Sequence, residues 1–66
     1  MNNPIFARYK FHKRDQLEHE SIEHYITALK VLVKDCEFTG NFEKEMVRDR
    51  LICGLKQHRI REKLLS

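Results

Sequence analysis

The sequence predicts an all-α fold, a small bundle of about four helices. Signals for β-strands are nearly absent. The only proline is Pro4, the only glycines are Gly40 and Gly54, and the stretches between them are rich in helix-forming residues. At 66 residues the chain is expected to form one domain, with a leading helix or linker over 1–18 and core helices over 19–66.

The first helix is expected to begin at Pro4, because proline suits the first turn of a helix and Asn3 suits the cap before it. The residues expected to share its apolar face are Ile5, Phe6 and Tyr9. Phe11 points elsewhere. The basic residues of the stretch are Arg8, Lys10, Lys13 and Arg14. Cations beside aromatic rings could also touch phosphate and stack bases, but we favour a helix whose aromatics fill the core.

Residues 21–37 carry the clearest helical pattern. Ser21 suits the N-cap, and the charge of Glu23 suits the positive end of the helix. The apolar residues that follow one helix face are Ile22, Tyr25, Ile26, Leu29, Leu32, Val33 and Cys36. A turn is expected over 38–41, because Gly40 and Asn41 tolerate positive φ. Val31 lies on the opposite side, either as a contact for another helix or subunit or, more simply, as one exposed valine.

The connection between these two helices is open to two interpretations. No glycine or proline lies between residues 5 and 39, so the two could fuse into one helix. However, residues 12–20 contain one apolar residue, Leu17, and a helix needs a buried face for most of its stability. We therefore expect a break near residues 16–21.

A third helix is expected from about Phe42 to Cys53, capped by Asn41 and stopped by Gly54 in the left-handed conformation. A short fourth helix follows over 57–65. The predicted core comprises Ile22, Tyr25, Ile26, Leu29, Leu32, Val33, Met46, Val47, Leu51, Ile60 and Leu64.

So short a chain needs help to be stable. A domain of this size buries only about 60% of its unfolded surface, so disulfides, a metal or oligomerisation commonly assist. Cys36 and Cys53 match no common disulfide framework, and we expect reduced, buried thiols in an intracellular protein. Self-association is therefore the expected stabiliser.

Composition disfavours several functional classes. The net charge of +3 is too small to indicate nucleic-acid binding. No apolar run approaches the roughly 18 residues that span a membrane, and no apolar stretch of the signal-peptide type follows Met1. The histidines and cysteines lack zinc-site spacings, and no phosphate-binding glycine loop is present. We expect no enzyme activity, no metal or cofactor and no small-molecule substrate.

The run from Gln16 to Val33 sets a glutamine four residues before a glutamate and then opens an apolar stripe. It resembles the major homology region of retroviral and retrotransposon Gag capsid proteins, in which Gln-x3-Glu leads into a helix with an aromatic residue five positions after the glutamate. Further blocks resemble Ty3/Gypsy-type Gag sequences. These blocks are Glu20-Ser21-Ile22-Glu23-His24-Tyr25, Cys36-Glu37-Phe38, Arg48-Asp49-Arg50-Leu51-Ile52-Cys53-Gly54-Leu55 and Ile60-Arg61-Glu62-Lys63-Leu64-Leu65.

The resemblance implies a capsid C-terminal domain, or a domesticated host protein derived from one, that dimerises and links subunits into a shell. It implies a hydrogen-bond network that ties a turn to a helix start, made by Gln16, Glu20, Ser21 and Tyr25. It places the dimer surface on the helix after the homology region, at Phe42, Met46, Asp49, Arg50 and Cys53. The expected partner is a second copy of the chain, with RNA a possible partner of other regions.

Two departures from the family pattern bear on the structure. The family often has glycine just after the glutamine or just before Glu-Ser, where this chain has Leu17 and His19. Without glycine at these two positions the chain adopts positive φ less readily. This would favour a continuous helix and exchange of elements between subunits. Relatives also carry one more helix after the Leu-Leu block, and its docking groove is expected to be open for a partner subunit.

Two alternatives remain at this point. One is the SCAN domain, a related capsid-derived module that dimerises transcription factors. The other is a basic helical module that binds nucleic acid. Beyond the cations of the first helix, its contacts would be Lys56, Arg59, Arg61 and Lys63.

Overall fold

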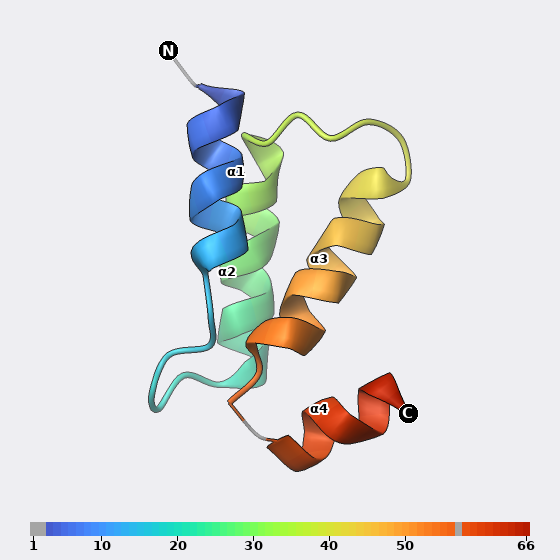
Figure 1. The fold of residues 1–66 in the computed structure, drawn as a ribbon. Coiled ribbons are helices and arrows are strands. Elements are labelled where there is room, and N and C mark those ends of the chain that lie inside the picture. The colour runs from blue at the N-terminus through green and yellow to red at the C-terminus, as the bar shows by residue number, and fades with distance from the viewer. Residues whose placement is uncertain (1–2, 57) are drawn as a thin grey trace.

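The computed structural model describes residues 3–56 and 58–66, with the backbone alone at 58–61. Four helices follow one another along the chain: α1 (Pro4–Lys13), α2 (Ile22–Lys34), α3 (Phe42–Gly54) and α4 (His58–Leu65). Helix α2 is central, with α1 beside it and α3 packed against it, while α4 contacts α3 below the end of that helix (Figure 1). The predicted small all-α bundle is confirmed.

Two of the three predicted helix caps make side-chain hydrogen bonds. The Asn3 side chain accepts hydrogen bonds from the backbone N–H groups of Ile5 and Phe6, directly before Pro4. Ser21 Oγ accepts the backbone N–H of His24 at 3.1 Å. Asn41 occupies the N-cap position of α3 but makes no side-chain capping bond. Each of the first two caps satisfies amide groups that the first turn of a helix leaves unpaired.

The core is a cluster of seven buried apolar residues around α2. Its members are Ala7, Phe11, Tyr25, Leu29, Val33, Cys36 and Leu55. Ile22, Leu32, Met46, Val47 and Leu51 are partly buried against it, in agreement with the predicted core. Ile26 is half-buried outside the cluster. The prediction for Leu64 was wrong, since it is 54% exposed, and the side chain of Ile60 lies outside the described residues.

The predicted inward face of α1 was also wrong. Ala7 and Phe11, four residues apart, face the core, whereas Ile5, Phe6 and Tyr9 are exposed. The Phe11 ring packs edge-on against Phe38 at 6.2 Å between ring centroids. The face of α1 that carries Ala7 and Phe11 is therefore the one that packs against the core, although it is narrower than the predicted face.

The connection between α1 and α2 is a loop over residues 14–21, so the fused helix does not form. His19 adopts a φ of 65°, the left-handed conformation that glycine supplies more easily. The turn therefore forms in spite of the missing glycine. Between α2 and α3, Gly40 takes the positive φ predicted for it, as does Glu37, but Asn41 does not.

Two further expectations need correction. Gly54 is the last residue of α3 and has no positive φ; its role is described below. Cys36 is buried as expected, but Cys53 is exposed, and neither forms a disulfide. Within the described residues, no helix is both long and apolar enough to cross a membrane.

Candidate functional site

The α1–α2 loop carries the residues of the Gag-like run, and Gln16 anchors it. Gln16 is 5% exposed. Its side-chain Nε2 donates to the backbone oxygen of Glu20 at 2.8 Å, and its Oε1 accepts the backbone N–H of Lys56 at 3.0 Å. Its own backbone N–H donates to the carbonyl of Gly54 at 3.0 Å. The side chain and the backbone N–H of Gln16 thus join the loop to the end of α3.

Glu20 is the charged centre of the loop. Its carboxylate, 3% exposed, accepts the backbone N–H of Leu17 at 2.9 Å and lies 2.6 Å from both the Arg14 guanidinium and Nδ1 of His24. The hydrogen bond from Arg14 and then the Leu17 amide lower the pKa of Glu20 from 4.5 to about 2, against the opposing effect of desolvation. The carboxylate is therefore ionised at neutral pH and closes the turn from inside.

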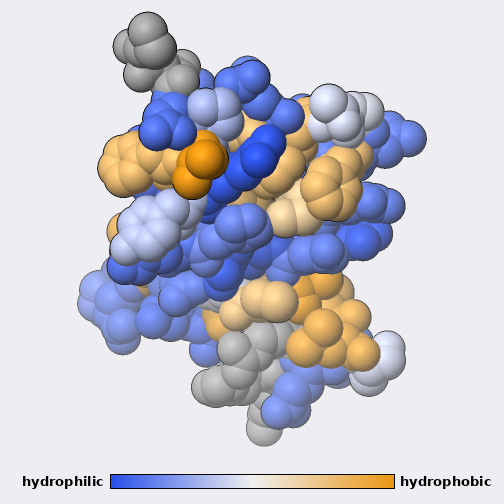
Figure 2. Space-filling model, turned by 45° about the horizontal axis from the view of Figure 1, so that its top comes forward, coloured by the Kyte–Doolittle hydropathy of each residue, from blue (hydrophilic) through white to orange (hydrophobic). Residues whose placement is uncertain are grey.

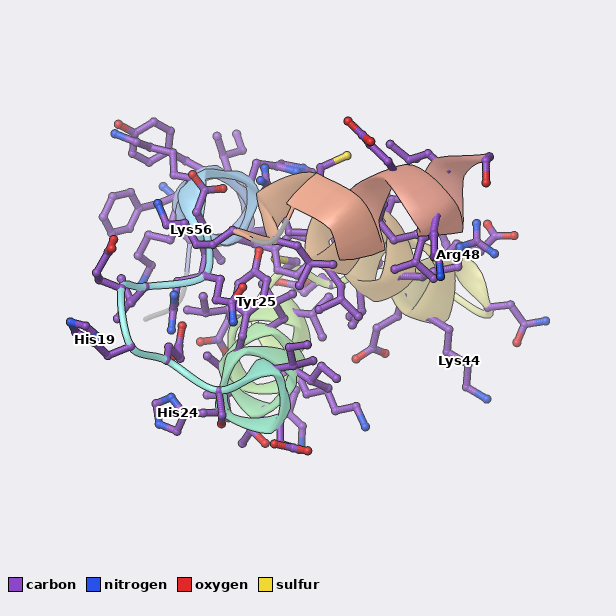
Figure 3. All side chains as sticks on the ribbon, turned by 90° about the horizontal axis from the view of Figure 1, so that it is seen from below. His19, His24, Tyr25, Lys44, Arg48 and Lys56 are labelled. Atoms are coloured by element: carbon purple, nitrogen blue, oxygen red, sulfur yellow. The ribbon has the colours of Figure 1, made fainter. Side chains whose placement is uncertain are left out.

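Tyr25 links this loop to α3 from the first turns of α2. Its ring is fully buried, and its hydroxyl lies 2.9 Å from the carbonyl oxygen of Arg14 and 3.2 Å from that of Arg50, within reach to donate to either. Burial raises the pKa of Tyr25, so the hydroxyl keeps its proton for these bonds. The ring projects into the centre of the molecule, whereas His19 and His24 point outward (Figure 3).

Gly54 leaves room for the tyrosine. A Cβ at this position would lie 1.9 Å from the Tyr25 hydroxyl oxygen, far inside contact distance. The sequence predicts this glycine as a helix stop, but its missing side chain is what lets the ring reach across to α3. The signal was the position of Gly54 on the same helix face as apolar residues, where the absence of a side chain permits close approach.

Arg50 was predicted at the dimer surface, yet its guanidinium bonds within the chain. It donates to the backbone oxygen of His12 and to the Asp15 carboxylate, the latter at 2.6 Å, and the side chain is 18% exposed. Arg14 and Arg50 are the members of this network that sequence reasoning missed. An arginine on the same helix face as Val47 and Leu51 could have indicated a buried polar partner.

The other four predicted dimer residues form a stripe along α3. Phe42, Met46, Asp49 and Cys53 recur at i, i+4, i+7 and i+11, which places them on one side of a helix. Phe42 is 49% exposed, Asp49 and Cys53 are exposed, and Met46 is partly buried. A hollow of about 170 Å³ is lined by Met46, Asp49 and Cys53 together with His12 and Arg50. We call Phe42, Met46, Asp49 and Cys53 the α3 stripe.

The predicted nucleic-acid contacts are described only in part. Lys56 and Lys63 are exposed, whereas the side chains of Arg59 and Arg61 lie outside the described residues. Two cations near the N-terminus are engaged internally: Arg8 of α1 donates to the carbonyl of Cys36 at 2.8 Å, and Arg14 of the α1–α2 loop binds Glu20. Across the described part of the chain, no three His, Cys, Asp or Glu side chains are grouped to hold a metal ion.

Comparison of the chain with protein-family models, curated proteins and solved structures gives no match.

Proposed function

We propose that the chain is a homotypic assembly module, the dimerising C-terminal domain of a Gag-like capsid protein, in which two copies pair through the α3 stripe. The observation that carries this proposal is the network of Gln16, Glu20 and Tyr25. These residues were singled out by their resemblance to the Gag homology region, and they converge in one hydrogen-bonded unit. By holding the loop to α3, that unit fixes the orientation of the face proposed to pair.

The amount of exposed surface supports self-association. The chain exposes 5207 Å², whereas a compact monomer of 8.0 kDa is expected to expose about 4,500 Å². Exposed apolar side chains also gather over α1 and near the C-terminal end (Figure 2).

The proposed mechanism is an isologous contact. In a two-fold dimer the same stripe serves both subunits, so Phe42 and Met46 would pack against the stripe of the second copy. Asp49 at the margin would remain hydrated or pair with a cation across the interface. In the assembled shell, such a pair would link neighbouring capsomers.

The test is the mass of the chain by sedimentation equilibrium over a wide concentration range. The wild-type chain should shift from monomer to dimer, and Met46→Asp should remain a monomer, because it places a charge in the contact. Phe42→Asp, at a more exposed position, serves as a second variant in case Met46→Asp perturbs the core. Val31→Asp on α2, where the valine is 62% exposed, is the matched control and should still dimerise.

Helical circular dichroism of each variant separates loss of pairing from loss of folding. A wild-type chain that stays monomeric at millimolar concentration would overturn the proposal. Folded stripe variants that dimerise as well as the wild type would place the contact elsewhere.

A further inference from the structure

A groove between α2 and α3 lies outside the α3 stripe and plays no part in the proposed dimer. It has a volume of about 550 Å³ and an apolar floor formed by Val33, Val47 and Leu51. Its rim carries four basic side chains, two from each helix. These are Lys30 and Lys34 from α2 and Lys44 and Arg48 from α3. Lys44 and Arg48 project from α3 toward the same side of the molecule (Figure 3).

The charge of the rim is unbalanced. One carboxylate, Glu43, shares it with the four cations. Within the described residues, Lys30, Lys34 and Lys44 form no ion pair, and Arg48 contacts only its exposed neighbour Asp49, at 3.2 Å. Both pairs of cations sit at i, i+4 on their helices, a spacing at which like charges repel each other. An anionic partner would relieve this repulsion on both walls.

The dimensions of the groove suit a short helix. Its α3 wall runs from Glu43 to Leu51, about two helical turns or roughly 12 Å. A helix laid along it would present apolar side chains at i, i+3 or i+4, and i+7 to the floor, as in helix-in-groove recognition. Carboxylates on the flanks of that helix would then face the lysines and the arginine.

The exposed apolar face that a second copy of this chain would offer on α1 lacks the matching chemistry. Its exposed apolar face on α1 is flanked by Lys10 and Lys13, each with its ammonium nitrogen about 5.0 Å from an aromatic ring centroid of that face. Cations there would oppose the basic rim. The phosphates of a nucleic-acid strand would pair with the basic side chains of the rim, but the strand's backbone would leave the apolar floor uncovered.

We propose that the α2–α3 groove binds an acidic amphipathic helix of a partner protein, with apolar side chains on Val33, Val47 and Leu51 and carboxylates against the four cations. This inference is independent of the α3 stripe, because the groove uses other faces of α2 and α3. A capsid-type subunit could thus recruit an acidic segment while its dimer surface remains engaged.

The test uses a labelled synthetic peptide of about four helical turns, with leucines at i, i+4 and i+7 and glutamates on the flanking positions. Its binding to the full chain is followed by fluorescence anisotropy at low salt, and the bound site is mapped by amide chemical shifts. We expect the shifts to centre on Val33, Val47 and Leu51. A peptide with lysines in place of the glutamates should not bind.

The decisive variant is the double substitution Lys44→Glu with Arg48→Glu, which should weaken peptide binding at least tenfold. The matched control is Lys10→Glu with Lys13→Glu on α1, which changes the net charge equally and should leave binding within about twofold. Both double variants should keep the dimer mass of the wild-type chain. A loss of peptide binding can therefore be distinguished from a loss of pairing through the α3 stripe.

Four outcomes would overturn the proposal. The first is absence of groove shifts at millimolar peptide. The second is equal weakening by both double variants, which would mean bulk attraction. The third is preferential binding of labelled oligouridine at the groove, which would make it a nucleic-acid site. The fourth is loss of the dimer in the Lys44 and Arg48 variant, which would make a second copy the occupant.

Discussion

At Gly54 a single hydrogen in place of a side chain decides whether the buried network can form. The Tyr25 hydroxyl occupies the space that a Cβ at residue 54 would need. Gly54 and Tyr25 are therefore one structural unit, although 29 positions separate them in the sequence.

Replacing Gly54 with alanine should destabilise the fold by about 1–3 kcal/mol, the usual cost of overpacking. The measurement is urea denaturation followed by circular dichroism. In a Tyr25→Phe background the same Gly54→Ala change should cost less, because the clashing hydroxyl is gone. Equal costs in the two backgrounds, or no cost in the wild type, would contradict the close approach.

Glu20 makes stability depend on pH over an acidic range. Its pKa is about 2 in the folded chain against 4.5 as the ordinary value, so the unfolded chain binds a proton more readily. The stabilisation is fully present above pH 4.5 and is lost as the pH falls toward 2. Stability measured at a series of pH values should therefore drop through this window.

Glu20→Gln should flatten that dependence, while Glu18→Gln, at an exposed carboxylate of the same loop, should leave it in place. NMR titration of the Glu20 carboxyl carbon gives the folded pKa directly. A value near 4.5 would contradict the charge-assisted contacts described here.

Among the elements, the α1–α2 loop shows how far the sequence predicts this fold. The break was predicted from the polar stretch before Ser21, and the caps at Asn3 and Ser21 from residue type, because each depends on local chemistry. The outcome at His19 was not predictable from residue type, since a non-glycine residue there was expected to resist positive φ. Bonds from Gln16 and Glu20 hold the turn and overcome that preference.

Helix α1 shows where local pattern fails. Its two apolar faces compete, and the larger face, with Ile5, Phe6 and Tyr9, was expected inside. Contacts with α2 and with Phe38 decide which face of α1 is buried. The periodicity of one short helix carries no information about such contacts. The same limit applies to Arg50, because its carbonyl and carboxylate partners, on His12 and Asp15, lie in other segments of the chain.

Replacing His19 with glycine should stabilise the protein by about 0.5–1 kcal/mol, because the left-handed conformation costs an L-residue more than it costs glycine. Thermal unfolding provides the measurement. Lys10→Gly, at an exposed position within α1, is the control and should destabilise by about 1 kcal/mol. A loss of stability in the His19 variant would show that the imidazole makes an essential contact.

For the whole molecule, the short chain leaves a large part of its surface uncovered. The Cα trace extends 38 × 24 × 17 Å, an elongated outline to which α4 contributes by contacting α3 at one end (Figure 1). Eight large hydrophobic side chains are exposed among the described residues. Pairing through the α3 stripe would cover one part of this surface, and an acidic helix in the α2–α3 groove would cover another.

The most direct test of the proposed pairing is the rate of Cys53 alkylation as a function of protein concentration. Cys53 is exposed on the α3 stripe, and Cys36, buried and with its thiol pKa raised by desolvation, is the internal control. Mass spectrometry after timed exposure to N-ethylmaleimide should show Cys53 slowing as the chain is concentrated, while Cys36 stays slow throughout. A Cys53 rate constant that does not change from micromolar to millimolar protein would contradict the pairing.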